Sequence, residues 1–271
     1  MNQEIYETLD NLSHKQIYQE LDEFIIRRIC QFAKTKKDAI VIAKFVLHVL
    51  PRNLSLDDRI RIALINLEFF KRNNLRVTIA PKFKISKCES DWWLHPECPI
   101  QFEISKEGQR IATFSFYVIP TQNELEIHVN NLQGVQEGYP TLEPPFLRYT
   151  KDDLKELTEL LKVNWRTHII RLIKEKFSEL HPKIIGDLPK LFKFIDHNKA
   201  ILMLRQYVQT YLQAGIPIEN ISVHNVNENY EEWARNNLRL KLGRQEGTIE
   251  QHQDRKRVKL EHKPGTRRPM P

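Results

Sequence analysis

Apolar residues recur every three or four positions through the first 75 residues, and this spacing is typical of amphipathic helices. Between residues 17 and 33 it predicts a helix with one apolar stripe, formed by Ile17, Leu21, Phe24, Ile25 and Ile29. The apolar run at 39–50 predicts a buried helix. Ser55 precedes a third periodic segment with two aspartates in its first turn, so we expect a capped helix that begins after Ser55.

The apolar period changes to two from about residue 76, as expected for β-strands. Alternating segments separated by short polar turns continue to about residue 134. They predict three or four strands of an antiparallel meander. Gly108 lies at one predicted turn and Pro120 at a predicted strand end, where these residue types are tolerated.

Beyond the proline-rich segment 139–145, helical and strand patterns alternate. We expect one long helix from Thr150 to about residue 180, a strand at 183–188, a helix closed by Gly215 and a strand near 219–226. The predicted fold is α+β, in which N-terminal helices and a meander precede a helix–strand–helix–strand unit that completes one mixed sheet. The expected organisation is a helical region at 1–75, an α+β domain at 76–242 and a disordered basic tail at 243–271.

The amino-acid composition indicates the cellular compartment in which the protein is expected. The 271 residues contain only three cysteines, which favours a reducing compartment, and no run of about 18 apolar residues that would predict a membrane span. The N-terminus lacks the basic-then-apolar order of a secretory signal, so we expect a soluble protein. The net charge of +7 is uneven, because residues 241–271 hold nine basic and four acidic groups. Attraction to polyanions is therefore expected mainly from the tail.

The tail contains the most specific short motif of the chain, KRVKLE at 256–261. It resembles eukaryotic nuclear import signals of the Lys-Arg-Val-Lys-Leu-Asp type, with Glu261 in place of the aspartate. The residues expected to bind an import receptor are Arg255, Lys256, Arg257, Val258, Lys259 and Leu260. The alternative is a tail that binds nucleic acid or chromatin through salt-dependent phosphate contacts.

A second candidate site is the glycine-containing loop after the meander. Gln133, Gly134 and Gly138 resemble the phosphate-binding loop of GNAT-type acetyltransferases, whose element order is similar to the predicted one. The resemblance implies acetyl-CoA as a cofactor and a splayed pair of parallel strands. The spacing of the glycines differs from that family, and Glu137 and three prolines separate them from the predicted helix.

The middle of the chain also resembles the bacterial VirK-like family over about residues 112–185. The matching positions lie in a strand, a strand end and a helix: Phe114, Ser115, Phe116, Leu132, Gln133, Gly134, Leu157 and Thr158. That family's usual segment after the helix start is absent here. The resemblance implies a virulence-associated bacterial protein and transfers no catalytic residue.

The sequence gives weaker support for a metal site or for catalytic residues. Cys88, His95 and Cys98 supply three zinc ligands, one fewer than a structural site needs, so we expect no metal. The acid–base candidates are His128, His168, His181 and His224. Ser115 lacks the flanking glycines of a nucleophile elbow.

The sequence therefore favours a non-enzymatic interaction protein, namely a bacterial effector whose tail directs it to the host nucleus, where it would act on nuclear partners. Without delivery to a host, a cytoplasmic location is expected. An acyl-CoA-dependent N-acyltransferase and a tail-mediated nucleic-acid-binding protein are the alternatives.

Overall fold

The computed structural model describes residues 2–15, 18–51, 53–73, 75–88, 100–134, 151–189, 197–223 and 236. Its centre is one sheet of seven strands, arranged in the order in which they occur along the chain. The strands are β1 (Val77–Ala80), β2 (Phe83–Lys87), β3 (Gln101–Lys106), β4 (Gln109–Pro120), β5 (Leu125–Gly134), β6 (Lys183–Asp187) and β7 (Ile221–Ser222). Strands β1 to β5 pair antiparallel, whereas β6 and β7 each pair parallel with the strand before. The predicted α+β fold with one mixed sheet is confirmed.

The helices before the sheet are α1 (Gln3–Ser13), α2 (Glu23–Cys30), α3 (Lys36–Lys44), the π-helical turn η2 (Phe45–Val49) and α4 (Leu56–Arg72). The start of α4 is confirmed, because the Ser55 hydroxyl accepts a hydrogen bond from the Asp58 N–H at 3.1 Å. The apolar run predicted at 39–50 is buried, and its end forms η2.

The stripe predicted for residues 17–33 was wrong at Phe24. The Asp22 carboxylate accepts from the Ile25 N–H at 2.8 Å and begins α2 there, later than expected. This helix buries Ile26 and Ile29 and leaves Phe24 70% exposed. Ile17 lies outside the described residues. The N-cap, rather than the apolar period upstream of it, therefore sets which face of α2 is buried.

Helix α4 is fixed to the sheet by a buried asparagine. Strand β3 pairs with β4 only as far as Ser115, and no other described strand pairs with the rest of β4 on that side. The Asn66 side chain meets this edge, donating to the Val118 carbonyl and accepting from the Val118 N–H, both at 2.7 Å. It also donates to the Ile62 carbonyl at 2.8 Å. One fully buried side chain thus satisfies both main-chain groups of Val118.

The elements after the meander are α5 (Lys151–Leu161), α6 (Trp165–Lys176), the 3₁₀ turn η3 (Ser178–Leu180), α7 (His197–Gln213) and the 3₁₀ turn η4 (Ile218–Asn220). The single long helix predicted from Thr150 is therefore wrong. Lys162 adopts a left-handed backbone conformation with φ of 55°, and the Asn164 side chain accepts from the Arg166 N–H at 3.0 Å. These two features end α5 and begin α6. Gly215, with φ of 78°, follows α7 as predicted.

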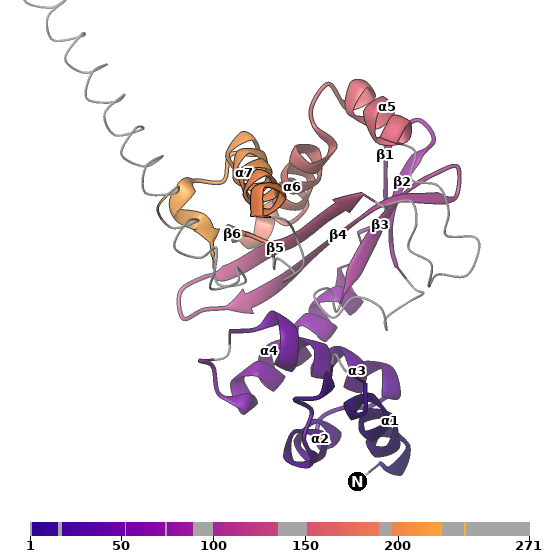
Figure 1. Ribbon diagram of the computed structural model, residues 1–271, viewed down its shortest axis with the longest axis vertical. Helices are drawn as coiled ribbons and strands as arrows, with labels where there is room; N and C mark the ends of the chain where they lie inside the picture. The colour runs from indigo at the N-terminus through magenta and orange to yellow at the C-terminus, as the bar shows by residue number, and fades with distance from the viewer. Residues whose placement is uncertain are drawn as a thin grey trace, which may run out of the picture. The chain divides into compact units, whose positions relative to one another are not determined.

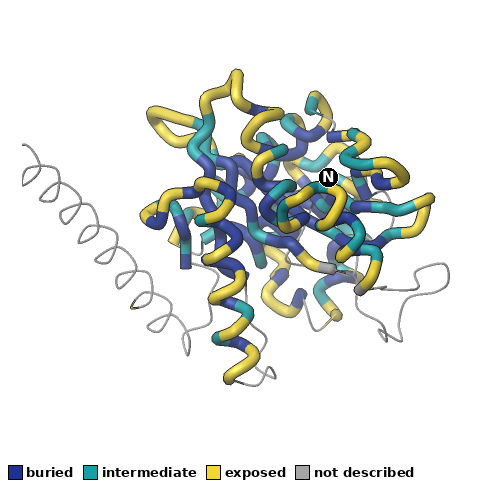
Figure 2. The backbone as a smooth tube through the Cα atoms, turned by 90° about the horizontal axis from the view of Figure 1, so that it is seen from above, coloured by how far each residue is buried: buried dark blue, intermediate teal, exposed yellow. Residues whose placement is uncertain are grey.

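The sheet lies between two groups of helices (Figure 1). Helices α6 and α7 lie on one side of β5 and β6, and α1 to α4 lie on the other. The most deeply buried segments, shown in dark blue in Figure 2, run through the middle of this arrangement. Phe102 and Phe116 stack there at 5.4 Å, and Phe70 of α4 packs on both. The aromatic core thus joins α4 to the meander.

The chain divides into two compact units, Met1–Val226 and Asn227–Pro271. The N-terminal helices and the sheet belong to the first unit. The predicted tail at 243–271 lies outside the described residues, as do Thr150 and residues 224–226 at the end of the strand predicted near 219–226.

Candidate functional site

A buried cluster of charged and polar side chains joins β4, β5 and β6. His128 Nδ1 lies 3.1 and 3.2 Å from the two carboxylate oxygens of Asp187, and its Nε2 lies 3.2 Å from Glu126 Oε2. The Tyr117 hydroxyl donates to Asp187 at 2.8 Å. Lys183 donates to Glu126 at 3.1 Å. Asp187 is fully buried and His128 nearly so, which places these charges in a low-dielectric environment.

The carboxylates keep the His128 imidazole charged. Burial would lower the pKa of His128, but the charge and hydrogen bond of Asp187, together with Glu126, raise it to about 9. The hydrogen bond from His128 outweighs burial and, with Lys183, lowers the pKa of Glu126 to about 2. Burial and the Asp187 charge raise the pKa of Tyr117 well above its usual value. Near neutral pH His128 is therefore an imidazolium that donates from both nitrogens.

This cluster lies on the side of the sheet covered by the N-terminal helices. The Tyr117 ring stacks on His128 with centroids 4.9 Å apart and meets the Phe45 ring of η2 at 6.2 Å. Because both His128 nitrogens contact carboxylates and the ring is enclosed, the cluster links neighbouring strands and is poorly placed to exchange protons with a substrate. The predicted acid–base candidate His128 therefore has a structural role. We call the cluster of Tyr117, Glu126, His128, Lys183 and Asp187 the clamp.

Beyond this cluster, strands β5 and β6 stop pairing and diverge. Their parallel register begins at Glu126–Lys183 and ends at Val129–Gly186. Asn130 is an extra residue in β5, since Ser115 pairs with Asn131 but Phe116 pairs with Val129. Such a bulge shifts the alternation of the strand by one residue. As a result the main-chain N–H and C=O of Leu132 point away from β4, toward the side that β6 has left.

The main-chain N–H and C=O of Leu132 are contacted by side chains from α6 and α7. Arg166 Nε donates to the Leu132 carbonyl at 2.9 Å. The Tyr207 hydroxyl lies 3.3 Å from the Leu132 nitrogen and 3.4 Å from its oxygen. Distances of this length indicate weak hydrogen bonds. Leu132 is itself buried, so a ligand that pairs with this edge of β5 must first displace the Tyr207 hydroxyl.

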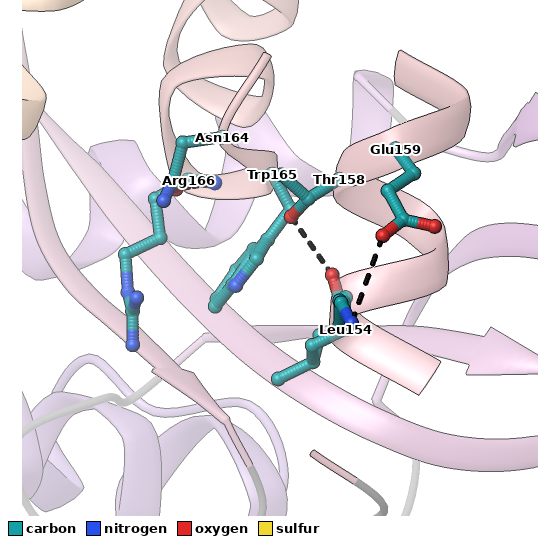
Figure 3. A pocket seen from close by; sticks show the side chains of 7 residues that line it. Leu154, Thr158, Glu159, Asn164, Trp165 and Arg166 are labelled. Carbon is teal, nitrogen blue, oxygen red and sulfur yellow. Dashed lines mark hydrogen bonds and ion pairs between the residues drawn. The ribbon is translucent and has the colours of Figure 1, made fainter. Parts of the chain in front are cut away.

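The break between α5 and α6 brings a helix N-terminus to this edge. Arg166 lies in the first turn of α6, and its side chain reaches Leu132 near the carboxyl end of β5. A shallow pocket of about 370 Å³ opens beside it (Figure 3). Its lining comes from one face of α5 and from the start of α6 with its N-cap: Leu154, Lys155, Thr158, Glu159, Asn164, Trp165 and Arg166. Carboxyl ends of parallel strands beside a helix N-terminus favour binding of anionic ligands.

The structure locates only part of the predicted sites. Gln133 is exposed, and Gly134 is the last residue of β5, opposite Ala112. Gly138 lies outside the described residues, as do all six predicted import residues, His95, Cys98 and His224. Cys88 is buried, with its sulfur 2.9 Å from Arg110 Nη2, and no metal-binding group of three side chains occurs among the described residues. Burial lowers the pKa of the half-buried His168, and His181 lies in the turn before β6.

The residues that shape the open edge were missed by the sequence analysis. Arg166, Asp187, Tyr207 and Tyr211 belong to segments that the apolar pattern assigns to helix or strand, and nothing in that pattern distinguishes them. One signal was present in the spacing of Tyr207 and Tyr211. Residues four apart lie on one face of a helix, so the spacing places the two tyrosine hydroxyls on the same face of α7.

Comparisons with protein-family models, with curated proteins and with solved structures find no match to this chain. Among the described helices, none is both long and apolar enough to span a bilayer.

Proposed function

We propose that the protein is an acyl-CoA-dependent N-acyltransferase that binds its donor along the open edge of β5. One observation carries this proposal. The parallel pair β5–β6 ends at Val129–Gly186, and the bulge at Asn130 turns the main-chain groups of Leu132 into the resulting gap. The order of a meander followed by helices, β6, α7 and β7 is similar to that of GNAT-type acetyltransferases.

The chemistry of the donor fits this edge. The pantetheine arm of an acyl-CoA is an extended chain with two amides, which can exchange hydrogen bonds with a strand edge. Such an arm would replace the long contacts of Tyr207 with Leu132. The phosphates of the donor are anionic, and the first turn of α6 with Arg166 offers N–H groups and a cation nearby. The acceptor amine, in its neutral form, would attack the thioester carbonyl, forming the C–N bond as the C–S bond breaks. The proton that the nitrogen loses balances the charge of the departing CoA thiolate, so that the products are the amide and the free CoA thiol.

Thermal denaturation with acetyl-CoA tests donor binding. A ligand at about 100 times its dissociation constant stabilises the folded state by about 2.7 kcal/mol. For a domain of this size, that corresponds to a rise in the unfolding midpoint of roughly 5–10 °C. Free CoA is the matched control for the acyl group and adenosine for the nucleotide. Absence of any shift with millimolar acetyl-CoA or longer acyl-CoAs would rule out the donor site.

Catalysis requires a second measurement, because binding alone does not establish transfer. Release of the CoA thiol from acetyl-CoA is followed with a thiol reagent while small amines, free amino acids and peptides are supplied in turn. Thiol release that depends on the amine, with an N-acetylated product detected by mass spectrometry, is the expected result. Donor binding without amine-dependent release would reduce the proposal to a CoA-binding protein.

The tail supports an independent proposal of location. The motif KRVKLE at 256–261 favours delivery to a eukaryotic nucleus, in agreement with the VirK-like resemblance and with an effector that acts on host nuclear partners. Residues 244–271 fused to a fluorescent protein should concentrate in the nucleus of eukaryotic cells. The matched control carries Lys256→Ala and Arg257→Ala. A diffuse signal from the unmutated fusion would contradict import, and a salt-sensitive affinity for DNA without import would favour the nucleic-acid alternative.

A further inference from the structure

The gap between β5 and β6 has a defined origin. Beyond its last partner on β5, strand β6 continues toward β7: Asp187 pairs with Ser222, and the Leu188 N–H donates to the Ser222 carbonyl at 2.9 Å. Strand β5 continues along β4 on its other side to Gly134. The two strands therefore diverge while each remains paired elsewhere. A side chain at the point of divergence is in a position to control the width of the gap.

Tyr211 of α7 lies at that point. Its hydroxyl is 2.9 Å from the Val129 carbonyl oxygen and 2.7 Å from the Asp187 carbonyl oxygen, one from each strand. The side chain is fully buried, and burial raises its pKa well above the usual value, so the hydroxyl keeps its proton. A hydroxyl carries a single hydrogen, which the two carbonyl oxygens must share. The Tyr211 hydroxyl thus occupies the space between the strands just where their register ends.

Gly186 fixes the ring of this tyrosine. A Cβ atom at Gly186 would lie 2.6 to 2.9 Å from three atoms of the Tyr211 ring, so the ring rests directly on the main chain of β6. Only glycine allows this approach. The ring and the hydroxyl together hold Tyr211 against both strands.

Tyr207 differs from Tyr211 although it lies one turn earlier on the same face. The two rings meet edge to face at 6.0 Å. The hydroxyl of Tyr207 contacts Leu132 of β5, beyond the bulge, at 3.3 and 3.4 Å, which is longer than the 2.7 and 2.9 Å of Tyr211. Helix α7 therefore presents one tyrosine with short contacts to both strands at the divergence and one with longer contacts to Leu132.

We infer that Tyr211 is a positioning residue that wedges β5 and β6 apart and thereby keeps the edge of β5 open for the donor, a role that rests on the proposed function. Tyr211 does not touch the donor. It keeps the strand ends from pairing further, so that β6 does not take up the main-chain groups of Leu132. Tyr207, in contrast, covers Leu132 until a ligand replaces it.

The test compares Tyr211→Phe and Tyr207→Phe in the full chain, each lacking one oxygen atom. In Tyr211→Phe the strands close, so amide hydrogen exchange in residues 131–134, measured by mass spectrometry, should slow, and acetyl-CoA binding should weaken about tenfold. In Tyr207→Phe the exchange of these amides should quicken, and acetyl-CoA should bind at least as tightly as to the wild type. A peptide from β3 serves as the internal reference for global stability.

Gly186→Ala is expected to change amide exchange in the direction opposite to Tyr211→Phe. Its added methyl group pushes the Tyr211 ring away from β6, while the hydroxyl is kept. It should speed exchange in residues 131–134. Unchanged or faster exchange in Tyr211→Phe would overturn the wedge and leave Tyr211 with a purely stabilising role. If exchange slows in Tyr211→Phe but the wild type binds no acyl-CoA, Tyr211 separates the strands and the protein has no acyl-CoA site. The experiment therefore distinguishes failure of the wedge from failure of the proposed function.

Discussion

The imidazole of His128 lies 3.1 Å from the carboxylate of Asp187, across the seam between two parallel strands. Their positions along the chain differ by 59 residues, and the crossover through α5 and α6 brings them together. The contact is one register step from the place where the strands diverge. On the opposite side of the sheet, Tyr211 contacts the main chain of the same aspartate. Asp187 thus ties the clamp on one side to the gap on the other.

Removing one member of the clamp should be strongly destabilising. His128→Met leaves Asp187 buried without its positive partner, and breaking such a buried pair costs about 3–5 kcal/mol. Urea denaturation followed by circular dichroism measures the loss. The double variant His128→Met/Asp187→Asn removes both charges and should lose less than the sum of the two single variants. Additive losses would show that the two side chains do not interact.

The clamp should also make stability depend on pH in a defined direction. The pKa of His128 is raised to about 9, so its contribution to the free energy of unfolding is complete below about pH 6.5 and is lost as the pH rises toward 9. The stability difference between wild type and His128→Met should therefore shrink between pH 6 and 10. A constant difference over this range would contradict a charged His128.

Glu126 should make the free energy of unfolding depend on pH in the acid range. Its pKa is lowered to about 2, so its contribution is complete above about pH 4.5 and is lost as the pH falls toward 2. The stability difference between wild type and Glu126→Gln should fall over that interval. The cluster as a whole should stabilise the fold most between about pH 4.5 and 6.5.

Asn66→Leu tests the connection between α4 and β4. It removes both partners of the Val118 main chain, and each buried polar group left without a hydrogen bond costs about 1–3 kcal/mol. We expect a loss of about 2–6 kcal/mol in the free energy of unfolding. Asn73→Ala is the matched control, because Asn73 makes one hydrogen bond to the Phe69 carbonyl in a partly buried site. Equal losses in the two variants would indicate that Asn66 contributes only as a helix residue.

The break between α5 and α6 predicts a stabilising substitution. Lys162 has φ of 55°, a conformation that costs a residue with a Cβ about 1 kcal/mol relative to glycine. Lys162→Gly should therefore raise the free energy of unfolding by up to about 1 kcal/mol. Lys155→Gly, within α5, should lower it by about the same amount. If both substitutions destabilise, the left-handed turn at Lys162 is incorrect.

The elements of this fold were largely predictable, because the apolar period reports local geometry. The change of period near residue 76 marks the first strand, Ser55 marks the start of α4, and Gly215 follows the end of α7. The errors arose where a short polar residue overrides a continuous apolar pattern. Asp22 resets the face of α2, and Asn164 begins a new helix within what reads as one.

The geometry of the candidate site was far less predictable. The expectation of a splayed parallel pair came from a family resemblance, and the residues named for it were glycines of the loop. The described features depend instead on long-range contacts, such as those of Arg166 and Tyr207 with Leu132. A pattern of apolar positions contains no information on which distant side chains meet a strand edge. The clamp around His128 was invisible for the same reason.

The support that Asn66 and Phe45 give to β4 has a consequence for dissecting the protein. A truncated chain that starts at residue 76 would keep every strand but lose the cover over Tyr117 and both hydrogen-bond partners of Val118. Half of β4 would then present an unprotected edge beside exposed aromatic rings, which is a template for self-association. Such a fragment should precipitate or form oligomers, so donor-binding measurements belong on the intact chain.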